Sequence, residues 1–559
     1  MKRKEPASPD KITEEPSNTD KIMNPQKTSR TESGKKEEKY DRQIRLWGLN
    51  GQKDLENANI CLINVTAAGT EALKCLILPG VGRYSIVDNT VITVEDVGNN
   101  FFFDSFSLGK SKAQIACELV QELNEDSVGH FYQKDPIELL NNDPEFFKKF
   151  TVVICSRVSE HGLLKLGNFL WHAHVPLVVC DNFGYFGILR IVVKEHIVIE
   201  AHPDNAFEDF RLDCPFPELV RYMDAIKLEE MSKLEHSHTP YLVLLYKYLE
   251  KWRKANNSQW PKSYQEKRVI KQMLQEGVLK NDDGIEFTEE NFDEAIRNVN
   301  IAYTATGIPD DIRKILKDTM ANHPLQSEVN SKFWILIRSL KEFVNQKGML
   351  PLRGTLPDMF SDSKRYIELQ NLYKTKADED IASVESFVRE ALSDLQLPAS
   401  FVSFDDIKLL CKNAFFLKVQ RGLSVHDELK QDPCAHKING SLQSMPPFAV
   451  DIYLLFRAIM RLFDDKVGDR YNLSSMKGFE KLKKLLSDVI QDIRCDVAVP
   501  QMYLEEILRC NVSEFHTTAS ILGGVCSQEV IKIITKQFVP IDNIFVYDGI
   551  SQQTASMKL

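Results

Sequence analysis

Short apolar runs and amphipathic segments alternate in the part of the chain that follows Lys39. The apolar runs have the length of buried strands, and the segments between them carry apolar residues at helical spacing. Strict alternation of strand and helix predicts a parallel sheet covered on both faces, which is a doubly wound α/β domain. The predicted strands are 59–65, 84–88, 151–156 and 176–181, and two predicted helices are 69–78 and 109–124.

Beyond about residue 200 the strand pattern gives way to helical periodicity. The apolar residues of segment 332–345 fall on one helical stripe, which a buried core face explains most simply. A helix at 516–536 and a strand at 544–547 fit a last addition to the first sheet, so the helical block between would be an insertion. Further helices are predicted at 364–395, 449–464 and 476–494.

Residues 1–38 contain no aromatic residue and few aliphatic ones. Lysine, glutamate, serine and proline are interleaved there, and such a segment buries too little apolar surface to offset the entropy lost on ordering. We therefore predict a disordered tail. Its basic run Lys2-Arg3-Lys4 has the composition of a nuclear address, although short basic runs are more often solvated charge.

Composition and charge exclude several classes of protein. The net charge of −10 argues against nucleic-acid binding, because such domains are usually basic. No stretch approaches the roughly 18–20 apolar residues of a membrane span, and the apolar core of a secretory signal is missing from the N-terminus. Eleven scattered cysteines without a CxxC pair indicate reduced thiols. We expect a location in the cytoplasm, and also in the nucleus if the basic run acts as an address.

The first strand-to-helix turn is where nucleotide-binding α/β domains place glycines, which let the backbone approach the phosphates. Here the turn at 64–69 is NVTAAG, and Gly69 is its one glycine. The side chains at the other positions would intrude on a phosphate. Taken alone, the segment is an ordinary βα turn.

Several long motifs resemble the family of ubiquitin-like-protein activating enzymes and follow that family's order. Bacterial enzymes that adenylate sulfur-carrier proteins share the fold. The motifs lie at both ends of the folded region, so the resemblance implies an α/β, Rossmann-like adenylation (ThiF/MoeB-like) domain with a large, mostly helical inserted domain. The motifs are YDRQIRLWG at 40–48, GKSKAQIACELVQELN at 109–124, VPLVVCDNFGYFG at 175–187 and HTTASILGGVCSQEVIKIITKQF at 516–538. The implied divisions are the tail at 1–38, the adenylation-like domain at 39–200 and 499–559, and the helical insert at 201–498.

Three departures from the family's active members fall in the nucleotide pocket. Active members have GxGGxG at the turn, and a second acidic residue for the ATP ribose where this chain has Thr90. They have an Asn-Arg-Gln run at 98–100, where this chain has Gly-Asn-Asn and so lacks the arginine that neutralises phosphate charge. Asp88 remains, placed at its strand end to hold the adjoining turn. The resemblance therefore implies that this chain binds no nucleotide cofactor.

From 39 to 559 the chain most resembles the regulatory, non-catalytic subunits of the heterodimeric activating enzymes of neddylation. The resemblance implies a catalytic partner subunit that holds ATP and Mg and carries the reactive cysteine. The pair would adenylate the C-terminal glycine of a ubiquitin-like modifier, form a thioester on the partner and pass the modifier to a conjugating enzyme. The shared motifs are VGNNFFF at 97–103, AHPDN at 201–205, HSHTP at 236–240 and FWIL at 333–336.

Arg42 is the residue that the resemblance implies in catalysis. In this family the corresponding arginine of the inactive half reaches across the dimer to the triphosphate in the partner's site. The planar fork of a guanidinium suits the charge that develops as pyrophosphate leaves. The alternative is a surface arginine on its own helix, where Asp41 and Arg45 are spaced to pair.

Other candidates have structural explanations of equal or greater weight. Lys110 matches a phosphate-binding lysine of active members, yet a surface lysine at a helix start explains it as well. Cys214 lies in a loop-like setting near the start of the family's cysteine domain but lacks the threonine that follows the reactive cysteine, so we interpret it as incidental. Two HxH pairs lack a third ligand, and no metal site is expected. These pairs are His172/His174 and His236/His238.

The helix at 332–345 has a second interpretation beside that of a core helix. Aromatic side chains often anchor protein interfaces, and the resemblance makes this helix a candidate contact with the catalytic partner. The candidate interface residues are Phe333, Trp334, Leu336, Ile337, Leu340 and Phe343.

Three alternatives stay open. In the first, the chain serves another modifier, such as the sumoylation one, whose related family shares the amino-terminal motifs. In the second, it is a self-sufficient adenylating enzyme or a nucleotide-dependent oxidoreductase, although the altered glycine turn counts against both. In the third, it is an adaptor that uses the fold only to bind other proteins.

Overall fold

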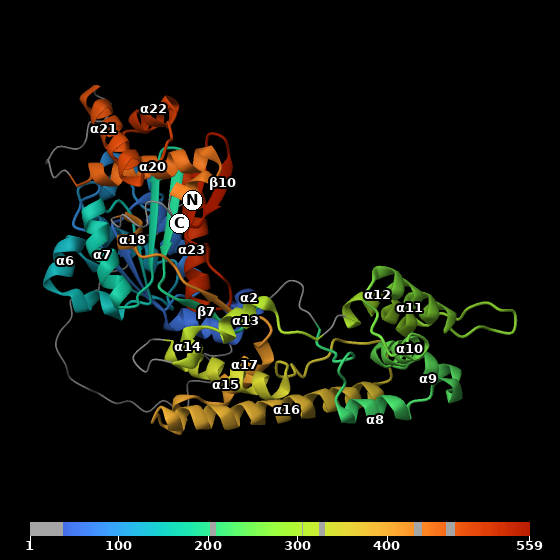
Figure 1. Ribbon diagram of the computed structural model, residues 1–559. Coiled ribbons are helices and arrows are strands. Elements are labelled where there is room, and N and C mark those ends of the chain that lie inside the picture. The colour runs from blue at the N-terminus through green and yellow to red at the C-terminus, as the bar shows by residue number, and fades with distance from the viewer. Residues whose placement is uncertain (1–36, 202–207, 304–305, 324–329, 430–438, 465–475) are drawn as a thin grey trace.

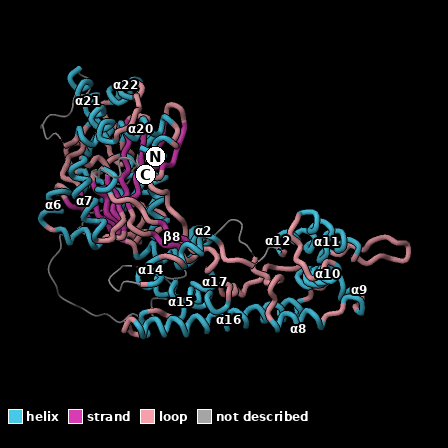
Figure 2. The backbone as a smooth tube through the Cα atoms, in the orientation of Figure 1, coloured by secondary structure: helices cyan, strands magenta, loops and turns pink. Residues whose placement is uncertain are grey.

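The computed structural model describes residues 37–201, 208–303, 306–323, 330–429, 439–464 and 476–559. The predicted tail with its basic run lies outside these ranges up to residue 36, and so does most of the motif at 201–205. A region built around a sheet and an arm of helices are distinguishable in Figure 1. Most strands gather in the first region, and the arm consists mainly of helices joined by loops (Figure 2).

An eight-stranded sheet in the order β10-β9-β6-β5-β4-β1-β2-β3 forms the centre of the first region. Strands β1 to β5 pair in parallel with one another. Strand β6 pairs antiparallel with both β5 and β9, and β9 pairs antiparallel with β10. The chain winds outward from β1 in both directions, which makes β1 and β4 the switch point where doubly wound sheets bind ligands. The strands are β1 (Asn59–Ile63), β2 (Arg83–Val87), β3 (Val128–Tyr132), β4 (Val152–Cys155), β5 (Leu177–Phe183), β6 (Phe186–Val192), β9 (Ile544–Asp548) and β10 (Gln553–Met557).

Helices cover both faces of this sheet. On one face α3, α5 and α23 form an apolar core with α2 beside them, and on the other α6, α7 and α18 pack against the strands. A side chain at Gly523 of α23 would meet the backbone of α3 at Ala72 N, 2.8 Å from an added Cβ, so this glycine permits the close packing of α3 and α23. The helices are α2 (Asp41–Asn57), α3 (Ala67–Ile77), α4 (Val94–Asn99), α5 (Lys112–Gln121), α6 (Pro136–Asn142), α7 (Glu160–His172), α18 (Val425–Leu429) and α23 (His516–Thr535).

The last part of the chain completes the sheet that the first part begins. β9 pairs antiparallel with β6, with Ile188 opposite Val546, and α23 packs along α3. The helical segments between β6 and α23 are therefore inserted into one α/β fold. This arrangement confirms the predicted fold class.

Two helices of the predicted insert, α20 and α21, and the helix α22 that follows it lie on the sheet itself, above it in Figure 1. They cover β5, β6 and β9 and share a core with Phe183, Phe186 and Ile188. Thirteen of the 16 residues of α20 are buried, as expected for a helix that is apolar on most of its surface. The sheet region therefore includes two helices, α20 and α21, that lie before residue 499 in the sequence. These helices are α20 (Pro447–Leu462), α21 (Met476–Ile493) and α22 (Gln501–Cys510).

The arm contains two apolar cores joined by α16, whose 32 residues span about 48 Å. Leu369 and Tyr373 of α16 pack among α8 to α12 in the outer lobe, whereas Val384 and Val388 pack among α13 to α17 near the sheet. The outer lobe consists of α8 (Pro217–Ala225), α9 (Lys233–Ser237), α10 (Tyr241–Ala255), α11 (Tyr264–Glu276) and α12 (Glu290–Ala302). The inner lobe consists of α13 (Asp310–Leu316), α14 (Thr319–Asn322), α15 (Ser331–Lys347), α16 (Ser363–Asp394), α17 (Phe404–Asn413) and the strand pair β7 (His196–Val198) and β8 (Lys418–Gln420).

None of the helices among the described residues combines the length and the apolar character that crossing a bilayer requires.

Candidate functional site

The carboxyl ends of the parallel strands meet beside the amino end of α3. The chain turns there at Asn64, whose φ of 64° lies in the left-handed region that asparagine tolerates better than most residues. Its side chain donates to the carbonyl of Ser156 at 2.8 Å and so bridges the ends of β1 and β4 across the switch point. Thr66 caps α3 by accepting from the N–H of Gly69 at 3.1 Å. We call this turn and the first residues of α3, 64–69, the cradle.

A carboxylate from the far end of the chain occupies the cradle. The backbone N–H groups of Ala67 and Ala68 donate to the two carboxylate oxygens of Glu514, at 2.6 and 3.1 Å. Glu514 is buried and lies between α22 and α23. Unpaired N–H groups and partial positive charge make a helix amino end the usual phosphate position in this class of fold. The anion at this position is therefore the protein's own side chain.

Asp88 uses both of its carboxylate oxygens inside the site. One accepts from the N–H of Val65 at 2.7 Å, and the other accepts from the N–H and the hydroxyl of Thr90 at 2.7 and 2.6 Å. The side chain is buried. The prediction that Asp88 holds the adjoining turn is confirmed, and Thr90 completes that bond network instead of offering a second carboxylate.

Asp181, at the carboxyl end of β5, adds a third acidic group. It accepts from the N–H of Arg157 at 2.7 Å. Burial raises the pKa of the Asp181 carboxyl to about 6, although that hydrogen bond and nearby guanidinium groups act to lower it. The guanidinium of Arg157 donates to the carbonyl of Val512 at 2.7 Å and so braces the segment that leads to Glu514. With Asp88 and Glu514, this edge carries three acidic side chains.

The run at 98–100 contacts the cradle region through neutral side chains. The side chain of Asn99 donates to the carbonyl of Glu514 at 3.4 Å. Asn100 is buried and accepts from the N–H of Phe102 at 3.0 Å. These two amides fasten the loop to the cradle, and neither supplies positive charge.

Arg42 lies far from this chain's own cradle. It is exposed in the first half of α2, before the kink at Gly48. The predicted pair forms beside it, with Arg45 and Asp41 joined at 2.9 Å. α2 meets the carboxyl end of α23, where Gln537 donates to the carbonyl of Trp47 at 2.8 Å, whereas the cradle adjoins the amino end, about 30 Å away along 20 residues of helix. Arg42 therefore serves no function in the cradle of its own chain.

Among the residues that the structure describes, neither Lys110 nor Cys214 has the surroundings of a catalytic group. Lys110 is exposed in the turn before α5. Cys214 is half-buried in the arm, and burial raises the pKa of its thiol, with the carboxylate of Asp213 raising it further. A reactive cysteine needs a depressed pKa, so this setting is that of an inert thiol.

The two histidine pairs are not brought together. The ring of His236 is buried and hydrogen-bonds Glu289 at 2.7 Å within the arm, whereas that of His172 contacts the carbonyl of Asn168 at 2.8 Å on α7. No group of three or more potential metal ligands occurs among the residues that the structure describes.

The proposed partner-contact residues of α15 lie inside the protein, and this interpretation was wrong. Each side chain is at most 5% exposed, within the core that α15 forms with α16 and α17. The indole N–H of Trp334 donates to Glu195 at 3.0 Å, which ties α15 to the segment between β6 and β7. The stripe is apolar because it is core. The residues are Phe333, Trp334, Leu336, Ile337, Leu340 and Phe343.

Sequence reasoning detected the altered cradle but missed its occupant. Glu514 is 447 residues from Ala67. It lies two residues before α23, and no local pattern shows that such a glutamate binds the amino end of a different, distant helix. The missing phosphate-binding residues were the one available sign that another group neutralises the helix end.

Fold and cradle together define a class of protein: an adenylation-type α/β domain whose phosphate position is filled from within. The family model described as ThiF family matches residues 40–559, and the chain belongs to this family. It is 46% identical over 529 residues to a protein of Xenopus laevis named NEDD8-activating enzyme E1 regulatory subunit, covering 94% of this chain and 99% of that protein. Identity to the proteins of that name from Drosophila melanogaster and Saccharomyces cerevisiae is 37% and 27%, covering 94% and 93% of this chain and 98% and 100% of theirs.

Proposed function

We propose that this chain is the regulatory subunit of a heterodimeric NEDD8-activating enzyme. Similarity over almost the whole length to proteins of that name supports the assignment. The observation that carries the non-catalytic role is the seating of Glu514 on the N–H groups of Ala67 and Ala68. A triphosphate would have to displace the buried carboxylate of Glu514 from these N–H groups, so ATP does not fit this cradle.

The chemistry then belongs to the partner subunit. In this proposal the partner holds ATP and Mg, adenylates the C-terminal glycine of the modifier and takes it onto its own cysteine as a thioester, before transfer to a conjugating enzyme. The inert environment of Cys214 supports the division of labour. This chain contributes its half of the dimer and part of the surface that holds the modifier. Its proposed location is the cytoplasm and the nucleus.

Arg42 is proposed to act in trans, at the triphosphate in the partner's site. Its exposure and its distance from its own cradle support this role. Arg42→Ala in the purified heterodimer is expected to slow ATP–pyrophosphate exchange about 10- to 100-fold, the effect of losing one charged hydrogen bond of about 1.5–3 kcal/mol.

Arg45→Ala is the matched control for Arg42→Ala, since Arg45 lies one turn further along and pairs with Asp41. This control should exchange at the wild-type rate, and both variants should form the dimer. Equal exchange rates in the two variants would remove Arg42 from the mechanism.

The proposed binding surface for the catalytic subunit consists of exposed apolar side chains in the first part of the sheet region. Eight of the 20 large apolar side chains that are exposed among the described residues lie between residues 46 and 108. Single exposed apolar residues are ordinary, but such a concentration is typical of an interaction surface. Phe101, Phe106 and Leu108 lie on one short segment, and Leu46 and Leu49 lie on α2, the helix of Arg42.

Reconstitution tests the function directly. The chain alone should bind no ATP in equilibrium titration, and co-expression should recover it with a second ThiF-type subunit that has an intact GxGGxG turn. The pair should form a thioester with NEDD8 and not with the sumoylation modifier. Micromolar ATP binding by the isolated chain, or thioester formation without a partner, would contradict the proposal.

A further inference from the structure

The first part of α2, residues 41–47, carries Arg42 and is set apart from the rest of the helix. Gly48, with a φ of 69° and a ψ of 175°, breaks the helical backbone after it. Isolated helices shorter than about 12–15 residues are marginal in water, and the N-cap residue, Tyr40, makes no side-chain capping bond here. The orientation of this segment therefore depends on its contacts with the rest of the protein.

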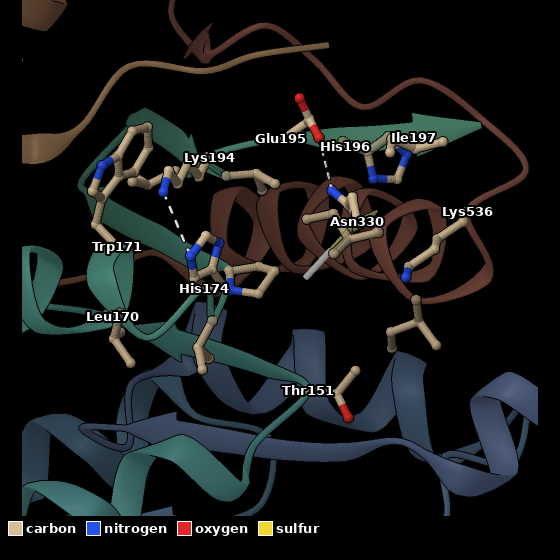
Figure 3. A pocket seen from close by; sticks show the side chains of 16 residues that line it. Thr151, Leu170, Trp171, His174, Lys194, Glu195, His196, Ile197, Asn330 and Lys536 are labelled. Atoms are coloured by element: carbon tan, nitrogen blue, oxygen red, sulfur yellow. Dashed lines mark hydrogen bonds between the residues drawn. The ribbon is translucent and has the colours of Figure 1, made fainter. Parts of the chain in front are cut away.

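The end of the segment is fixed by Trp47. Its side chain is buried, its indole N–H donates to Oε1 of Gln52 at 3.1 Å, and its carbonyl accepts from the side chain of Gln537 at 2.8 Å. The residue before Gln537 is Lys536, which caps the end of α23 and lines the cavity of about 170 Å³ between the sheet region and the arm (Figure 3). Contacts at one end do not fix the direction of a segment, so its start needs a contact of its own.

The start of the segment is anchored through the side chain of Tyr40. This side chain is buried, and its hydroxyl donates to Oδ2 of Asp126 at 3.0 Å and accepts from the amide of Asn124 at 3.0 Å. Burial raises the pKa of this hydroxyl, so it stays protonated and remains a donor at neutral pH. A Cβ added at Gly80 would lie 2.9 Å from the ring, so the glycine leaves room for it.

Asn124 and Asp126 connect this anchor to the sheet region. Asn124 is buried, and its amide also donates to the carbonyl of Ile77 at the end of α3, at 2.8 Å. Lys39 bridges the two side chains, because its ammonium donates to Oδ1 of Asn124 and to Oδ2 of Asp126, both at 2.7 Å. The two residues directly before α2 are thus held by the loop that follows α5.

We propose that Asp126 and Asn124 are positioning residues for Arg42. Through Tyr40 and Lys39 they hold the start of α2, so that the guanidinium of Arg42 projects from the surface in one direction. The proposal rests on the proposed action of Arg42 at the triphosphate in the partner's site. A small misplacement of a group that acts on the transition state slows a reaction strongly, even when its cause lies far from the reacting atoms.

The test is a double-mutant cycle in the purified heterodimer, followed by ATP–pyrophosphate exchange. Asp126→Ala removes an acceptor of Lys39 and Tyr40 and is expected to lower kcat about fivefold to tenfold, with the KM for the modifier unchanged. Adding Asp126→Ala to Arg42→Ala is expected to produce no further loss, since a positioning residue acts only through the side chain that it positions. Losses that multiply in the double variant would indicate a general structural effect and would overturn the proposal.

Glu125→Ala is the matched control, because it removes an exposed carboxylate from the same loop, and it should exchange at the wild-type rate. Asp126→Asn keeps an oxygen acceptor for the Tyr40 hydroxyl and should recover most of the wild-type rate. If Asp126→Ala lowers the unfolding temperature, Tyr40→Phe takes its place in the cycle, since it keeps the buried ring and removes both bonds of the hydroxyl.

The cycle separates this proposal from the one on which it rests. Wild-type exchange by Arg42→Ala would remove the role of Arg42 in trans and the positioning role with it. Slow exchange by Arg42→Ala together with wild-type exchange by Asp126→Ala would overturn the positioning role alone.

Hydrogen exchange of the full-length chain without its partner supplies a second readout. The backbone amides of residues 43–47 should exchange faster in Asp126→Ala than in Glu125→Ala, because the start of α2 is no longer anchored. Equal amide exchange in the two variants would show that Asp126 does not hold this segment and would overturn the proposal whatever the activity of the heterodimer.

Discussion

The carboxylate of Glu514 does for α3 what a phosphate does in a nucleotide-binding member of the fold. It satisfies two N–H groups that would otherwise be unpaired, and it places negative charge at the positive end of the helix dipole. The charge arrives on a covalently attached side chain, so the site needs no ligand to be stable. An exchangeable anion gains nothing by entering, since it must break these bonds first.

Glu514→Ala is therefore expected to destabilise the sheet region by about 1–3 kcal/mol, because it leaves two buried donors unpaired. Thermal unfolding followed by circular dichroism measures the effect. Glu505→Ala, an exposed glutamate on α22, is the control and should unfold at the wild-type temperature. A Glu514→Ala protein as stable as the control would show that the carboxylate is not a structural ligand of α3.

The sequence predicted an altered phosphate position because the alteration lies in residues that are absent from a local motif. It could not predict Glu514, because the pairing depends on how α22 and α23 dock onto α3. The role of Asp88 in holding the turn was predictable because its partners are local. A carboxylate at the end of a strand, two residues from Thr90, has backbone N–H groups within reach.

At the scale of elements, α15 shows where periodicity stops being informative. Its apolar stripe was predicted, and the helix forms, yet a stripe that packs in a core and one that packs on a partner have the same pattern. Burial by α16 decides the matter for Phe333 and Trp334. Among the missed strands, β3 is partly exposed throughout and includes Gly129 and His130, so it lacks the apolar run that marked β1 and β4.

The strand β7 carries a pH-sensitive attachment between the two regions. His196 begins β7 and is buried, and its pKa is lowered to about 4 by burial, with Lys536 adding to the effect. Because the folded pKa lies below the unfolded value of about 6.5, the unfolded chain takes up a proton first as pH falls. Stability is thus intact above pH 6.5 and is lost between about pH 6.5 and 4, by up to about 3 kcal/mol.

His196→Gln keeps an amide donor for the Phe538 carbonyl but removes this titration. The unfolding temperature of the variant is expected to fall less than that of the wild type between pH 7 and pH 4.5. His172→Gln, at an exposed position, should follow the wild type. Parallel pH profiles for His196→Gln and wild type would exclude His196 as the source.

At the scale of the whole molecule, the order of elements along the chain explains how the last segment both completes the sheet and fills the cradle. β9, β10 and α23 return to the sheet after the arm is complete, and the segment that brings them back also delivers Glu514. The same returning segment thus completes the sheet and supplies the carboxylate that fills the cradle. The motifs at both ends of the sequence made the insertion predictable, but the packing of α20 to α22 on the sheet follows from long-range apolar contacts that no local pattern encodes.

The proposed interface makes a prediction that separates association from folding. Phe106 is 79% exposed on the segment before α5, so Phe106→Asp should leave the stability of the isolated chain unchanged. The same change should weaken binding of the catalytic subunit at least tenfold, because it places a charge in an apolar contact. Phe404→Asp, at a 50% exposed position on α17 in the arm, is the matched control and should bind normally. Affinities measured by surface plasmon resonance decide the point: equal weakening in both variants would move the interface away from residues 46–108, and no weakening in either would exclude Phe106 from it.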